Sequence, residues 1–134
     1  MKNGWNVTTD PATGIMKFSF LSGDGQPVAR FSANPSDVRL AQRMEKVAES
    51  FAAMTDQTSA EEYDAFLENK ICEILGENQR KDLFSNMSAT TVLPGGGLFA
   101  MEIIRQLHSS VIPELKKRRE KVADAIRKHT AKYQ

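Results

Sequence analysis

The stretch of sequence that decides the fold class lies at residues 16–33, where two short runs of alternating residues flank a turn. An apolar side chain at every second position is typical of a strand with one face buried. Glycines between the runs reach positive φ without a clash and favour a turn. We therefore predict a β-hairpin over residues 15–33, formed by Met16-Lys17-Phe18-Ser19-Phe20, Ser22-Gly23-Asp24-Gly25-Gln26 and Val28-Ala29-Arg30-Phe31-Ser32-Ala33.

The hairpin presents one apolar face, which consists of Met16, Phe18, Phe20 and Phe31. A lone hairpin is marginally stable in water, so this face must cover helices or the strands of a partner. Unpaired strand edges are also a template for pairing with another copy. We predict a homo-oligomer with the hairpin or the last helix at the contact, and Phe18, Phe20 and Phe31 as candidate interaction residues.

The segment before the hairpin, residues 1–14, is polar and contains the breakers Asp10-Pro11 and Thr13-Gly14. This composition predicts a flexible arm. In the alternative interpretation Trp5 holds the arm against the body of the protein.

Two amphipathic helices follow the hairpin. Asn34-Pro35 is a good start for the first, with Asn as the N-cap and Pro at the first helical position. The capping box Thr58-Ser59-Ala60-Glu61 predicts the start of the second, and Gly76 is placed to end it in the left-handed conformation. Their stripes at three- and four-residue spacing are Val38, Ala41, Met44, Val47, Ala48, Phe51 and Met54, then, after a break at 55–57, Tyr63, Phe66, Leu67, Ile71, Ile74 and Leu75.

The rest of the chain reads as a short helix, a loop and a long helix. Residues 77–84 form the short helix with Leu83 and Phe84 turned inward, and residues 85–97 form a loop that could act as a hinge. The long helix starts at Leu98, and Pro113 should kink or restart it. The predicted class is mostly α (α+β): a single domain, 1–134, with an N-terminal β-hairpin, a helical bundle over 34–128 with a long C-terminal helix, and a tail at 129–134.

Composition places the chain among soluble globular proteins. Hydrophobic residues make up 40% and charged residues 26% of the sequence, which is near the average for globular domains. There is no signal-peptide-like start and no apolar run of the ~18 residues needed to span a bilayer. The single cysteine, Cys72, excludes an internal disulfide and fits a reducing compartment. We expect a cytoplasmic protein.

Two separate segments of the chain carry opposite charge. Residues 36–82 contain 11 Asp/Glu and 6 Lys/Arg, a balance of −5, whereas residues 110–134 contain 3 Asp/Glu and 8 Lys/Arg, a balance of +5. Such a split favours docking to other chains, although the basic end could instead fold onto the acidic helices. The basic candidates for interaction are Lys116, Lys117, Arg118 and Arg119.

Candidate chemical sites are weak in this sequence. Cys72, His108 and His129 lack the spacing of a metal site or a nucleophile–base pair. Gly95-Gly96-Gly97 precedes a helix, but Leu98-Phe99 stand where a phosphate loop needs Lys-Ser/Thr. The carboxylates of Glu61, Glu62, Asp64, Glu68, Glu73 and Glu77 form an acidic face that at most serves docking. We therefore predict no catalytic residue, no cofactor and no metal, and no enzymatic activity.

The order of elements resembles that of the tail assembly chaperones of long-tailed bacteriophages and prophages. The likeness rests on Tyr63–Gly76, on Lys81-Asp82-Leu83-Phe84-Ser85 after it, and on the long helix from Leu98, within residues 36–128. In that family an acidic helix likewise precedes a short turn containing Phe and a closing helix. The insertion at 94–97 and the proline at 113 depart from the family pattern and put the continuity of the last helix in doubt.

The resemblance implies a non-enzymatic protein of the bacterial host cytoplasm that binds a long, helical tape-measure-type protein, helps recruit tail-tube protein and associates with other copies of itself. The alternative from the residues is a small nucleic-acid-associated protein that uses Lys116–Lys132. We rank it second because no aromatic residue interleaves these basic side chains apart from Tyr133 after them, and because no recognition-helix pattern precedes them.

Overall fold

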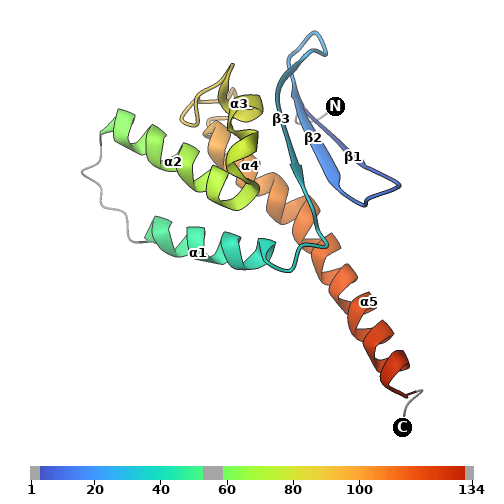
Figure 1. Cartoon of the computed structure of the whole chain (residues 1–134). Coiled ribbons are helices and arrows are strands. Elements are labelled where there is room, and N and C mark those ends of the chain that lie inside the picture. Colours follow the sequence, from blue (N-terminus) through green and yellow to red (C-terminus); the bar gives the residue numbers. More distant parts are fainter. Residues whose placement is uncertain (1–3, 53–58, 132–134) are drawn as a thin grey trace.

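The computed structural model describes residues 4–52 and 59–131 and shows an α+β fold. A three-stranded antiparallel sheet in the order β1-β2-β3 is followed by helices, the last of which is long (Figure 1). The strands are β1 (Trp5–Thr9), β2 (Met16–Leu21) and β3 (Pro27–Ala33). The predicted class and its hairpin are confirmed.

The predicted flexible arm is wrong for residues 5–9, which form β1. This strand pairs with β2 in a register that places Trp5 opposite Phe20 and Val7 opposite Phe18. Only Trp5 is buried, while the next four residues are exposed, so the strand lacks the apolar alternation that marks β2. The Asp10 carboxylate accepts hydrogen bonds from the N–H groups of Ala12 and Thr13 and closes the turn that returns the chain to β2.

The predicted apolar face of the hairpin lies against the rest of the chain. The Phe18 and Phe31 rings stack across β2 and β3 with centroids 4.4 Å apart. Met16, Phe18 and Phe31 are buried and Phe20 is half-buried. The sheet therefore contributes its aromatic side chains to the core of its own chain.

The first helix, α1 (Leu40–Ala52), begins later than Asn34-Pro35 predicted. The side chains of Asn34 and Asp37 each accept a hydrogen bond from the backbone N–H two residues ahead, and these local turns compete with helix formation. Val38 was predicted in the apolar stripe of this helix; it lies before α1 and is 62% exposed.

The second helix, α2 (Ala60–Leu75), starts where the sequence predicted, with the Ser59 hydroxyl accepting from the Glu62 N–H. Gly76 ends it at φ 113° and ψ 141°. The need for glycine is confirmed because φ is positive, but the conformation is not left-handed helical. Thr58, Met54 and the predicted break at 55–57 lie outside the described residues.

A single 3₁₀ turn (Glu77–Gln79) leads into α3 (Arg80–Phe84), and Leu83 is buried as predicted. The loop at residues 85–97, which was predicted as a possible hinge, is held in place by hydrogen bonds. Thr91 O and Ala89 O accept from the N–H groups of Phe99 and Ala100, and the Asp64 carboxylate accepts from the N–H and hydroxyl of Thr90. These contacts fix the loop to the start of the next helix, and they give no support to a hinge that would let this helix move.

The C-terminal rod consists of α4 (Phe99–Gln106), a π-helical turn (Leu107–Val111) and α5 (Ile112–Ala131). Leu107 and Ile112 both keep right-handed helical angles, and Figure 1 shows α4 and α5 as one continuous rod. The wider π turn, in which the Ile112 N–H bonds to Leu107 O, accommodates Pro113 without breaking the rod. Helix therefore continues through residues 129–131 of the predicted tail; residues 132–134 lie outside the described part.

Helix α4 is the centre of the core. Its Phe99 ring is fully buried and lies within 6.5 Å, centroid to centroid, of Trp5, Phe20 and Phe84. On its other side α4 packs on α2. The aromatic rings of the sheet and the aliphatic side chains of α2 thus meet on the same helix.

Candidate protein-interaction site

The aromatic residues predicted for a partner lie inside the chain. Phe18 is 1% exposed and Phe31 is 4% exposed. Phe20 is half-buried and its ring contacts Trp5 and Phe99. None of the three offers a free apolar surface, so a contact between copies through this face would require the core to open.

The outer edge of β3 is covered by side chains. The Gln79 amide accepts from the Ser32 N–H at 2.6 Å and donates to Ser32 O at 2.9 Å, as a neighbouring strand would. Farther along the strand Asn86 donates to Val28 O at 3.1 Å. In the described sheet β1 is the other outer strand, and no described strand pairs with its outer edge.

The acidic face of α2 is largely engaged within the chain. Asp64 holds Thr90, Glu73 pairs with Lys70, and Glu68 and Glu77 both contact the Arg80 guanidinium. The hydrogen bond from Arg80 holds the pKa of Glu77 below its ordinary value and, conversely, raises the pKa of Arg80. These carboxylates therefore secure α2, α3 and the loop more than they form a free docking surface.

The basic residues predicted for interaction lie on α5, which projects from the body (Figure 1). Lys116, Lys117 and Arg119 are exposed, and Arg118 is half-buried. Arg118 pairs with Glu114 of its own helix. No ion pair among the described residues joins α5 to α2, so the basic end does not fold onto the acidic helices.

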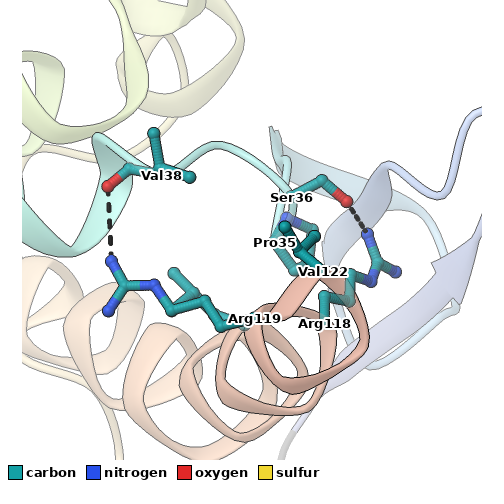
Figure 2. Close-up of a pocket in the computed structure, with 7 residues that line it drawn as sticks. Pro35, Ser36, Val38, Arg118, Arg119 and Val122 are labelled. Atoms are coloured by element: carbon teal, nitrogen blue, oxygen red, sulfur yellow. Dashed lines mark hydrogen bonds between the residues drawn. The ribbon is translucent and has the colours of Figure 1, made fainter. Parts of the chain in front are cut away.

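A small apolar hollow lies where α5 passes the turn before α1. Figure 2 shows Arg118 and Arg119 reaching from α5 to the Ser36 hydroxyl and the Val38 carbonyl, at 3.0 and 3.4 Å. The hollow has a volume of about 110 Å³ and leaves Val38 and Val122 more than half exposed. The two arginines therefore hold the base of α5 against the turn, with apolar surface between them.

A larger apolar groove lies between α1 and the C-terminal rod. It has a volume of about 290 Å³ and is lined by Met44, Val47, Ala48, Phe51, Ile74, Met101, Ile104 and His108. Helix α1 packs on α2, where the Phe51 and Phe66 rings meet edge to face at 5.5 Å. The wall formed by α4 is left partly uncovered, with Met101 and Ile104 half-buried and His108 exposed.

This groove was not predicted, although most of its lining residues belong to predicted apolar stripes. Met44, Val47, Ala48, Phe51 and Ile74 all belong to the stripes predicted for the first two helices, but apolar spacing within a helix does not show how completely a neighbouring helix will cover it. One feature of the sequence could have indicated the groove, which is that α1 and α4 have more apolar positions than one buried stripe needs. Ala48 and Ile104 each lie beside the buried stripe of their helix, where a complete bundle would cover them.

The candidate chemical residues do not come together. Cys72 is buried, and burial raises the pKa of its thiol, which disfavours the reactive thiolate. His108 lies at the groove on the rod, and His129 lies near the far end of α5. Residues 4–52 and 59–131 contain no group of three or more His, Cys, Asp or Glu side chains arranged to hold a metal ion.

No helix in the described part of the chain is both long and apolar enough to cross a membrane. Comparison with known proteins finds no matching family model, no similar curated protein and no similar solved structure.

Proposed function

We propose that this chain is a non-enzymatic assembly chaperone that binds an amphipathic segment of a longer helical protein, of the tape-measure type found in long-tailed phages, and helps tail assembly in the cytoplasm of the bacterial host. The observation that carries the proposal is the groove between α1 and the rod. The resemblance of the sequence to tail assembly chaperones suggests the identity of the client.

The groove suits a helical client in shape and chemistry. The lining stretches Met44–Phe51 and Met101–His108 each extend ~10 Å along their helices, enough for about two turns of a bound helix. A helix can place side chains three or four residues apart into such a groove. Two of the lining residues are methionines, whose flexible thioether side chains adapt to apolar partners of different shape.

The test is co-expression with a long, coiled-coil-rich protein of the tape-measure type, sought among the products of the neighbouring genes. We expect the chaperone to raise the soluble fraction of that protein and to co-purify with it. Ala48→Arg places a large cation at the exposed rim of the groove and should abolish both effects. Gln42→Arg, an exposed change elsewhere on α1, is the matched control. If wild type neither solubilises nor retains this protein, the proposal is wrong.

One observation favours the second candidate, a nucleic-acid-associated protein. Lys116, Lys117, Lys121 and Lys128 are exposed on a projecting helix, and none has an ion pair with a described residue. Such a helix could follow a phosphate backbone, with binding that weakens steeply as salt rises. Alanine at Lys116, Lys117, Arg118 and Arg119 should then abolish a shift of duplex or single-stranded DNA at low salt. The absence of any shift by wild type would eliminate this candidate.

A further inference from the structure

The outer part of α5, residues 116–131 (the α5 extension), has no described element packed along most of its length. Beyond Arg119 every described residue is exposed. At 1.5 Å per residue the extension is ~24 Å long. An isolated helix of this length is only marginally stable in water. Contact with another surface would therefore stabilise the α5 extension.

The α5 extension carries a narrow apolar stripe between cations. Val122 and Ile126, one turn apart, are 58% and 59% exposed. Lys121 and Lys128, seven residues apart, share one side of the helix next to this stripe. Residues 116–131 contain seven Lys/Arg and two Asp/Glu, a balance of +5.

The groove offers the complementary pattern. Its floor is apolar, and at ~10 Å it is about as long as the stretch from Lys121 to Lys128, which contains Val122 and Ile126. Glu45 and Glu49 each follow a lining residue of α1 by one position, which places them on the solvent side of that wall. Both are exposed, and neither has an ion pair with a described residue.

We propose that the groove of one copy binds the α5 extension of a second copy. Val122 and Ile126 occupy the apolar floor, and Lys121 and Lys128 face Glu45 and Glu49 of the neighbour. The contact is head-to-tail, because each copy uses its groove toward one neighbour and its extension toward another. A client helix would have to displace the neighbour's extension, so self-association keeps the groove covered until a client binds.

Two other arrangements are less favourable. The chain cannot fill its own groove, because α4 forms one wall and α5 continues from α4 away from it (Figure 1). Pairing two α5 extensions with each other would bring two segments of charge +5 together, which costs free energy. The neighbour's groove supplies both apolar cover and carboxylates.

The test uses two variants that each disable one half of the contact. Ala48→Arg blocks the groove and leaves α5 intact, whereas Ile126→Glu spoils the stripe and leaves the groove intact; both positions are exposed. A contact this small is expected to be weak, so the protein is measured at tens of micromolar. At this concentration light scattering should give wild type a mass above that of one chain. Each variant alone should be a monomer. Their mixture should have twice the mass of one chain and no more, because only one intact contact can form.

Lys116→Gln and Ala65→Arg serve as controls. Lys116→Gln changes the charge by the same amount as Ile126→Glu but on a face of α5 away from Lys121 and Lys128. Ala65→Arg makes the same substitution as Ala48→Arg at an exposed position of α2 outside the groove, and both controls should assemble like wild type. Circular dichroism verifies that every variant is folded. A monomeric wild type, an Ala48→Arg variant that assembles normally, or a mixture that stays monomeric would each overturn the inference.

The inference does not rest on the proposed function. Ile126→Glu keeps its groove and should still solubilise a client, so loss of self-association with retained client binding separates the two. If wild type assembles as described but binds no client, only the proposed function fails.

Discussion

The side of the molecule that contains the sheet and the side formed by α1 and α5 both carry regularly spaced apolar residues. These residues are largely buried on the sheet side, whereas several of them are exposed on the α1–α5 side. On the sheet side, Phe18, Phe31 and Phe99 are within 4% of complete burial and lie in one aromatic cluster. On the α1–α5 side, Val38, Val122 and Ile126 are more than half exposed, and a groove remains open. An apolar stripe is therefore buried only where a second layer covers it, and the uncovered stripes are the surfaces available to partners.

The largest expected effect comes from removing the ring at the centre of the sheet side. Phe99→Ala deletes contacts to Trp5, Phe20 and Phe84 and leaves a cavity, so it should lower the free energy of unfolding by about 3–5 kcal/mol. Ile126→Ala on the exposed stripe should change it by less than about 0.5 kcal/mol. Urea unfolding of both variants, below the concentration at which copies associate, measures the difference. Equal losses of stability in the two variants would contradict the contrast between the buried ring and the exposed stripe.

A smaller effect is expected at the covered edge of the sheet. Gln79→Ala removes the side chain that bonds to both backbone groups of Ser32, and should cost about 1–3 kcal/mol because partly buried polar groups lose their partners. Asn86→Ala removes one exposed bond to Val28 and is the control. Hydrogen exchange at the Ser32 amide should speed up in the first variant only. Unchanged exchange there would mean that Gln79 does not close this edge.

The smallest effect concerns acid stability on the rod. The hydrogen bonds from Arg105 hold the pKa of Glu102 below its ordinary value. A depressed folded-state pKa stabilises the protein above the unfolded-state pKa, and this contribution disappears as the pH falls through the folded-state value. The pair is partly exposed, so Glu102→Gln should cost less than about 1 kcal/mol at pH 7 and nothing at low pH. Urea unfolding from pH 7 downward measures this, and a difference independent of pH would contradict it.

Much of the fold could be predicted from local chemistry. The alternation from Met16 to Ala33 predicted β2 and β3, the Ser59 cap predicted the start of α2, and Gly76 predicted its end. One local prediction failed because side chains satisfied the backbone in another way, since Asn34 and Asp37 form turns before α1. The interruption predicted at Pro113 takes the form of a π turn between α4 and α5 within one continuous rod.

The candidate interaction site was harder to predict because it depends on what fails to pack. Phe18, Phe20 and Phe31 were identified as partner-facing, yet α4 and β1 cover them. The groove could not be predicted, because apolar spacing gives the direction of a face within its helix and not the distance to the next helix. Two alternatives were open for the basic residues on α5, which were docking to other chains and folding onto the acidic helices. No ion pair among the described residues supports the second.

The amino-acid sequence alone was enough to show which positions are apolar, where most strands and helices lie, and that charge of opposite sign collects in different segments. These properties are local, because periodicity, caps and turns involve residues a few positions apart. Tertiary structure alone decided that Trp5 draws β1 into the sheet, that Gln79 closes the edge of β3, and that α1 leaves α4 partly uncovered. Those outcomes depend on contacts between residues tens of positions apart, whose geometry is set by the packing of whole elements and is not encoded in any short stretch of the chain.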